Sequence, residues 1–146
     1  MQRSKFVFST RETVHYRFPT HVNDLVMDRA EAETSEVFLV VLEPGEGPPL
    51  HAHDDTEQVF YVLEGSGTLQ IGEARLEHAV SAGDVVRIPP RTLHRIQCHG
   101  PGALRYLSVD CFLGGRPAAE PTWESHVKLM CAQNGWDFDS IVTNKQ

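Results

Sequence analysis

The sequence has little cysteine, few basic residues and no long apolar run. Its 146 residues include three cysteines, Cys98, Cys111 and Cys131, without a CxxC pair, so we expect reduced thiols. The 13 basic residues are outnumbered by 20 acidic ones, and no basic cluster is present to neutralise a phosphate backbone. No apolar run is long enough to span a membrane, and residues 1–12 lack the apolar core of a signal peptide. We therefore expect a cytoplasmic protein that binds neither nucleic acid nor membranes.

Three histidines mark the stretch on which the functional interpretation depends. His51 and His53 are separated by one residue, so on an extended strand both imidazoles lie on the same face. The third, His94, follows a turn at residues 89–92. Imidazole is a good ligand for zinc, iron, copper and nickel. The spacing predicts that these three histidines bind one divalent transition-metal ion.

The histidines stand within two motifs that resemble those of the cupins. The first motif is carried by Gly45, His51, His53, the Glu57/Gln58 pair and Gly65, and the second by Gly83, Pro89 and His94. Two motifs in the right order, within about residues 35–112, are more specific than either motif alone. The sequence departs from the family pattern at Gln58 (usually glutamate), Arg91 (usually glycine) and Cys98 (usually asparagine). The resemblance implies a jelly-roll β-barrel, a bound metal ion and a homodimer.

Short strands with turn signals at close intervals also predict an all-β fold. Strands are expected at residues 5–8, 14–18, 35–43, 57–63, 68–72, 75–80, 85–88, 92–98 and 103–112. This pattern is typical of an antiparallel barrel or jelly roll. The length and the hydrophobic content of 40% indicate one domain over residues 1–146, with its barrel core at about 35–112.

The segments on either side of this core are expected to differ from each other. Residues 1–34 form an N-terminal arm of strands, which in small cupins commonly pairs with the partner subunit. In the tail at 117–146, apolar residues recur at helical spacing between a threonine cap and an Asn-Gly end, which predicts one short helix. We expect Trp123 and Met130 to pack against the outer wall of the barrel, and His126 to lie on the surface.

The fourth metal ligand is either Gln58 or Glu57. The resemblance implies a ligand five residues after the second histidine and seven before the glycine, and both counts lead to Gln58. Because neighbours on a strand point to opposite faces, only one of the two residues can be a ligand on a regular strand. With Gln58 inward, Phe60 and Val62 also face the cavity, whereas Glu57 would need a slip of one residue.

A set of three neutral imidazoles and an amide leaves the charge of a divalent ion uncompensated, so the ion remains a strong Lewis acid. We expect metal-dependent isomerisation, cyclisation or elimination of a small oxygen-bearing molecule, with zinc, iron, manganese or nickel as the metal. Neutral three-histidine iron sites in the same superfamily activate dioxygen, so a dioxygenase dependent on iron, manganese or nickel is an alternative. A small-ligand binding module without turnover is a second alternative.

Four further residues are candidates for the pocket. Arg91 can hold an anionic group of the small-molecule substrate, or can be a turn residue with its side chain in solvent. Tyr106 can supply a general acid if it faces inward. Ile96 and Cys98 alternate with His94 along one strand and can face the pocket, Cys98 as a small apolar residue.

Overall fold

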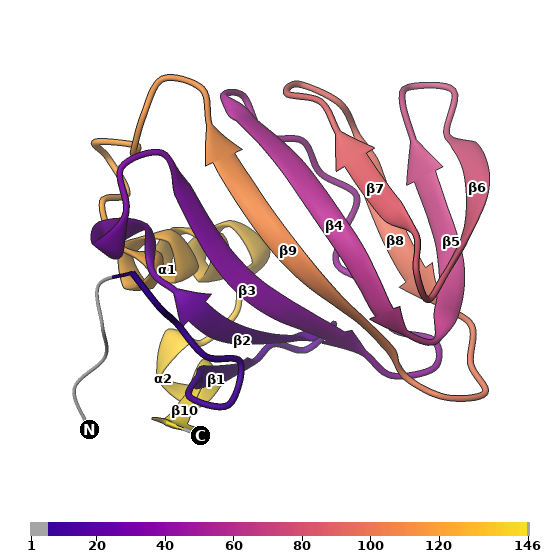
Figure 1. Cartoon of the computed structure of the whole chain (residues 1–146), viewed down its shortest axis with the longest axis horizontal. Coiled ribbons are helices and arrows are strands. Elements are labelled where there is room, and N and C mark those ends of the chain that lie inside the picture. Colours follow the sequence, from indigo (N-terminus) through magenta and orange to yellow (C-terminus); the bar gives the residue numbers. More distant parts are fainter. Residues whose placement is uncertain (1–5, 146) are drawn as a thin grey trace.

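Two antiparallel sheets form the body of the protein in the computed structural model, which describes residues 6–145 and the side chains of residues 6–141 (Figure 1). The large sheet contains, in spatial order, β10 (Val142–Lys145), β1 (Val14–Arg17), β2 (Val22–Met27), β3 (Ser35–Leu42), β9 (Leu104–Phe112), β4 (Thr56–Glu64) and β7 (Val85–Ile88). The small sheet contains β6 (Leu76–Ser81), β5 (Ser66–Ile71) and β8 (His94–Cys98). The expected all-β architecture with a C-terminal helix is confirmed.

Strand β9 lies at the centre of the large sheet and shows why these residues form a sheet with one buried face. Its side chains alternate, with Leu104, Tyr106, Ser108, Asp110 and Phe112 buried and the residues between them partly exposed. It pairs in register along most of its length with β3 on one side and with β4 on the other. The buried face of β9 therefore forms part of the interior wall, and it carries polar as well as apolar groups.

The two sheets pack face to face and share one apolar core. Leu42, Val62 and Leu104 from the large sheet and Leu69 and Ile96 from the small sheet belong to the same cluster of buried residues. No continuous ladder of strand pairs joins the sheets among residues 6–145, so the architecture is a sandwich rather than a closed barrel.

The chain passes from one sheet to the other at Gly65, between β4 and β5. Its φ of +85° is a conformation that side chains disfavour, and a Cβ placed there would lie 2.2 Å from the carbonyl oxygen of Ala103. Glycine at this position of the first motif is therefore required by the close approach of two backbones. Strand β4, which carries Gln58, ends directly before this crossing.

The N-terminal arm extends the large sheet within the same chain. Strand β2, which the sequence did not predict, pairs with β3 and with β1. The strand expected at residues 5–8 is not formed at residues 6–8, where Phe6 and Val7 are exposed. Lys5 lies outside the described residues. After β2, the 3₁₀ helix η1 (Arg29–Glu31) places the buried Arg29 beside β3.

Helix α1 (Trp123–Asn134) packs against the buried face of the large sheet and not on an outer wall, which corrects the expectation for Trp123 (Figure 1). The Trp123 ring lies 4.7 Å from the ring of Phe38, on the buried face of β3. Thr122 accepts a hydrogen bond from the Ser125 N–H at the start of the helix, and Gly135 ends it in the left-handed region. A short helix, α2 (Phe138–Ile141), then leads into β10. Within residues 6–145 no helix has the length and apolar character needed to cross a bilayer.

Candidate metal centre

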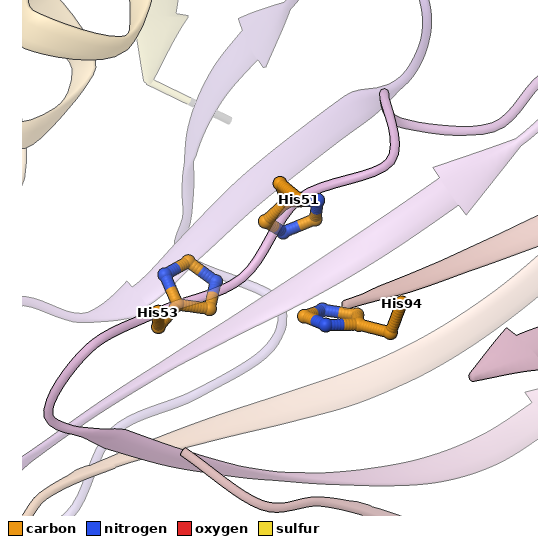
Figure 2. Close-up of side chains that lie close together, drawn as sticks. All are labelled: His51, His53 and His94. Atoms are coloured by element: carbon orange, nitrogen blue, oxygen red, sulfur yellow. The ribbon is translucent and has the colours of Figure 1, made fainter. Parts of the chain in front are cut away.

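Three histidine rings converge at one end of the interior (Figure 2). His51 and His53 come from the proline-rich loop before β4, and His94 begins β8. The backbones of His51 and His94 exchange two hydrogen bonds, of 3.2 and 2.9 Å, which hold the loop against the strand. One ring nitrogen from each of the three residues lies within 4.8 Å of the other two. A single metal ion can be bound by three nitrogens in this arrangement.

Backbone carbonyl groups determine which ring nitrogen of two histidines is available. The Nδ1 of His51 is 2.6 Å from the carbonyl oxygen of Pro49, and the Nδ1 of His94 is 3.0 Å from that of Thr92. A carbonyl oxygen only accepts, so each Nδ1 carries the proton and each Nε2 keeps its lone pair. The Nε2 atoms of His53 and His94 are buried without a hydrogen-bond partner. These are the properties that metal-binding imidazoles require.

Burial also keeps the three imidazoles in the form that binds metal. It lowers the pKa of His53 and of His94 to about 3, and mutual repulsion between the histidines acts in the same direction. Burial lowers the pKa of His51 as well. All three rings are therefore neutral at physiological pH, and a metal ion meets no competition from protons there.

Gln58 faces the interior and Glu57 faces the outside. Gln58 is 5% exposed and lines the same cavity as the three histidines, whereas the Glu57 carboxylate bonds to Arg87 at 2.7 Å on the outer surface. The Oε1 atom of Gln58 is buried without a partner, while its Nε2 donates to Oδ1 of Asp110 at 2.7 Å. The amide is thus held by its nitrogen, and its oxygen is left for a further ligand.

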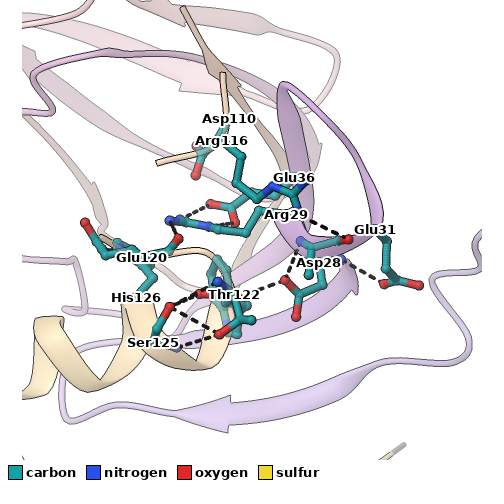
Figure 3. Close-up of polar contacts among 12 residues, drawn as sticks. Asp28, Arg29, Glu31, Glu36, Asp110, Arg116, Glu120, Thr122, Ser125 and His126 are labelled. Carbon is teal, nitrogen blue, oxygen red and sulfur yellow. Dashed lines mark hydrogen bonds and ion pairs between the residues drawn. The ribbon is translucent and has the colours of Figure 1, made fainter. Parts of the chain in front are cut away.

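Buried charged residues lie beside Asp110, the hydrogen-bond partner of Gln58 (Figure 3). Arg29 donates to both carboxylate oxygens of Glu36, at 2.7 and 2.8 Å, and to the backbone carbonyl of Glu120 at 2.9 Å. Burial, followed by the hydrogen bond to Asp110, raises the pKa of Glu36, although Arg29 opposes the shift. Glu36 stands opposite Asp110 in the β3–β9 register, so the Arg29–Glu36 ion pair lies beside the Asp110–Gln58 hydrogen bond.

The histidines and Gln58 open onto a cavity of about 580 Å³. Phe60, Ile96 and Tyr106 line it, as expected from the sequence. Tyr106 is 2% exposed and burial raises its pKa, so the phenol keeps its proton. Val62 and Cys98 are fully buried in the core but do not line the cavity, because their positions lie deeper between the sheets.

Arg91 lies outside the cavity. It is exposed in the turn before β8 with a φ of +56°, and it donates to the backbone carbonyl of Asp54 at 3.0 Å. The turn directs this side chain along the loop surface, so its position gives no support for a role in holding an anionic group. The arginine that lines the cavity is Arg29, whose guanidinium is occupied by Glu36 and the Glu120 carbonyl.

Helix α1 supplies cavity residues that the sequence analysis missed. Trp123, His126 and Met130 line the cavity, so His126 is not the surface residue we expected. The Nδ1 of His126 lies 2.7 Å from the Oε1 of Glu120 (Figure 3). A positive charge on His126 would lower the pKa of both His51 and His53, which places it near the metal centre. Helical spacing predicted the apolar face of α1, but no signal in the sequence indicates which side of a sheet that face meets.

The cupin domain model matches residues 38–110, which include both motifs and every candidate metal ligand. The chain belongs to the cupin family. Its jelly-roll fold agrees with that of a predicted oxalate decarboxylase from Thermotoga maritima, with a TM-score of 0.66 at 21% identity over 73% of this chain and 99% of that one. At this identity the likeness establishes the shared cupin fold.

Two sequence relatives each match part of this cupin. An uncharacterized protein from Methanocaldococcus jannaschii is 38% identical over 58 residues, 40% of this chain and 45% of that protein. Auxin-binding protein 1 from Arabidopsis thaliana is 32% identical over 81 residues, 51% of this chain and 40% of that protein. The matches span less than half the length of these relatives.

Proposed function

We propose that this cupin is a metal-dependent enzyme acting on a small oxygen-bearing molecule. His51, His53, His94 and Gln58 would hold one divalent transition-metal ion. The observation that carries the proposal is the set of buried acceptor atoms without a partner, the Nε2 atoms of His53 and His94 and the Oε1 of Gln58, which line one cavity. Such atoms cost about 1–3 kcal/mol each when left unpaired, and a bound cation would satisfy all of them.

The ligand set favours Lewis-acid chemistry. Three neutral imidazoles and an amide leave the charge of a divalent ion uncompensated, so the ion, when bound, supplies polarisation of a carbonyl or acidification of a water molecule. The chain supplies the rest of the environment. Phe60 and Ile96 give the cavity apolar walls that exclude bulk water. Isomerisation, cyclisation or elimination of a carbonyl compound is the reaction class that we propose.

We propose His126 as the residue that moves a proton in such a reaction. When Nδ1–H of His126 donates to the Glu120 carboxylate, the lone pair stays on Nε2, and Glu120 fixes the ring orientation. That nitrogen can take a proton from a substrate carbon or hydroxyl group and return it at the neighbouring position. An arrangement with one base on α1 and the metal ligands on the opposite wall would place the substrate between them.

Metal content and turnover test this proposal in sequence. Elemental analysis of the purified protein should find about one transition-metal ion per chain, and the double variant His51→Ala/His53→Ala should lose it. The apoprotein is then loaded with zinc or iron(II) and screened with keto-acids, sugar acids and catechols, with and without oxygen. Turnover with zinc in the absence of oxygen supports the Lewis-acid reaction. Activity only with a redox metal and with oxygen consumption would replace it with a dioxygenase.

The role of His126 has its own test. His126→Gln should retain metal and reduce turnover by about 10²–10⁴-fold, the usual contribution of general acid–base catalysis. Loss of metal in this variant would instead make His126 part of the ligand environment. Unchanged turnover would eliminate it as the proton carrier.

A binding module without turnover is the second candidate, and one comparison favours it. Auxin-binding protein 1, a relative at 32% identity over half of this chain, is named for binding a small organic ligand. If no compound is converted with either metal while one binds tightly and is recovered unchanged, the binding function replaces the enzymatic one.

A further inference from the structure

Three more buried polar atoms without partners lie in the cavity, apart from the metal-binding set. They are Oδ1 of Asn23, Oγ of Ser108 and Nε1 of Trp123. These residues are 5%, 0% and 1% exposed, and all three line the cavity. They come from β2, β9 and α1, which are far apart in the sequence. Nothing in the two histidine motifs accounts for them.

The three side chains are grouped around Phe38 on the buried face of β3. Ser108 stands directly opposite Phe38 in the β3–β9 register, and the Trp123 ring packs on the Phe38 ring at 4.7 Å. Asn23 stands opposite Val40, two residues further along the same face of β3. Directly opposite and diagonal neighbours on adjacent strands lie within about 5–8 Å of each other, so Ser108 and Asn23 each lie beside Phe38, on the two sides of β3. The three polar groups therefore surround one phenylalanine ring and line one wall of the cavity, and they are called a cluster in this sense.

The groups that could supply a positive charge beside this cluster are already paired, and His126, whose ring lies 5.6 Å from the Trp123 ring, is bonded to the Glu120 carboxylate. The nearby Arg29 uses Nε and Nη2 on Glu36 and Nη1 on the Glu120 carbonyl. Asp110, two residues after Ser108 on the same face of β9, adds a carboxyl group that would repel an anion. The indole N–H is a donor only, whereas the amide and the hydroxyl can donate and accept. Together these groups match hydroxyl and carbonyl oxygens without a formal charge.

We propose that Asn23, Ser108 and Trp123 form a recognition site for the uncharged, hydroxyl-bearing end of the cavity's ligand. This inference rests on the proposed function in one respect: the opposite end of the ligand would reach the metal centre. The ligand class that follows is a neutral polyhydroxylated carbonyl compound, such as a small sugar or hydroxyketone. A ligand with a carboxylate at this end would meet buried groups unable to neutralise it.

Matched probes test the chemical class. Metal-free protein is titrated calorimetrically with dihydroxyacetone and xylose, and with the carboxylates of corresponding length, glycerate and xylonate, because a bound divalent ion would itself attract a carboxylate. At least one neutral compound should bind more tightly than its carboxylate counterpart. A panel in which neither neutral compound does so would overturn the proposal.

Substitutions that remove one hydrogen-bonding group each test the residues. Ser108→Ala and Trp123→Phe each remove one hydrogen-bonding group and should weaken the neutral probe about tenfold, with zinc affinity unchanged. The matched controls are Ser81→Ala, on the exposed strand β6, and Trp136→Phe, whose ring packs on Phe18 outside the cavity. Equal binding by Ser108→Ala and the Ser81→Ala control would overturn the assignment.

Stability separates recognition from a structural role. Removing an unpartnered buried hydroxyl should leave the urea midpoint of Ser108→Ala unchanged or higher, because no hydrogen bond within the protein is lost. A clearly lower midpoint would show that the hydroxyl stabilises the fold, against our inference. Failure of the proposed function is recognised separately. If wild-type protein binds no zinc, but its metal-free form binds the neutral probe and Ser108→Ala weakens that binding, the recognition site stands and the metal centre does not.

Discussion

The hydrogen bond from Gln58 to Asp110 gives a prediction about metal binding that needs no knowledge of the substrate. Both side chains are 5% exposed, and the 2.7 Å contact fixes the Gln58 amide by its nitrogen. Asp110→Leu removes the acceptor with little change in size. The amide can then rotate, and its nitrogen, which cannot bind a cation, competes with its oxygen for the position facing the cavity. We expect zinc affinity to fall because the ligand is no longer oriented in advance.

The size of the effect follows from the bond that is lost. A hydrogen bond to a carboxylate contributes about 1.5–3 kcal/mol, and residues that orient metal ligands typically change metal affinity about 10–100-fold. Asp110→Asn is the matched control, since it keeps an oxygen that can accept from Gln58 Nε2 and should retain most of the affinity. Glu57→Leu, on the outer face of the same strand, should retain all of it.

The assay is competition for zinc against a chromophoric chelator at pH 7.5, with unfolding curves to establish that each variant is folded. An Asp110→Leu variant with wild-type affinity would refute the orienting role of Asp110. If His51→Ala/His53→Ala also keeps full affinity, the site itself is misplaced.

Gln58→Glu extends the test, because a third carboxyl group beside Asp110 and Glu36 should be poorly tolerated unless it takes up a proton.

Two further predictions concern stability. Unfolded imidazoles take up protons near pH 6.5, whereas His53 and His94 in the folded, metal-free protein do so only near pH 3, so the free energy of unfolding should fall as the pH is lowered through this range. Urea midpoints at pH 7.5 and 5 that do not differ would contradict this. Arg29→Met leaves the fully buried Glu36 without its cation. The free energy of unfolding, measured with urea, should fall by about 3–5 kcal/mol. Arg87→Met breaks an exposed ion pair and should lower the free energy of unfolding by less than about 1 kcal/mol. Equal losses in the two variants would refute the expected difference between the buried and the exposed pair.

The local part of the site was predictable because a strand has a period of two. The single residue between His51 and His53 indicates that their side chains share a face, and once the family motif pointed to Gln58, the same period excluded its neighbour Glu57. The structure places His51, His53 and Gln58 in one cavity. Arg91 shows the limit of this reasoning. A turn has no fixed period, so the sequence could not indicate whether its side chain points into the cavity or along the surface.

The long-range part of the site could not be read in this way. The contacts of Arg29 with Glu36 and Glu120 join three segments separated by up to 91 residues. The helical spacing of α1 indicates an apolar face but not the surface that it covers, and it was therefore assigned to the wrong side of the sheet. Such contacts depend on how sheets and helix pack, which the hydrophobic pattern of a single segment does not encode.

Strand β2 was missed for a reason that connects the fold to the function. Its sequence contains adjacent polar residues, Asn23 and Asp24, which interrupt the apolar alternation expected of a buried strand. Asp24 faces outward and bonds to His15 at 2.6 Å, while Asn23 faces the cavity with an unpartnered oxygen. An inward polar residue weakens the strand signal and at the same time gives the cavity a group that can recognise a ligand. Ligand-binding groups are therefore to be expected where a polar residue interrupts the hydrophobic pattern of a buried strand. In this cupin, Asn23 on β2 and Ser108 on β9 both stand at such positions.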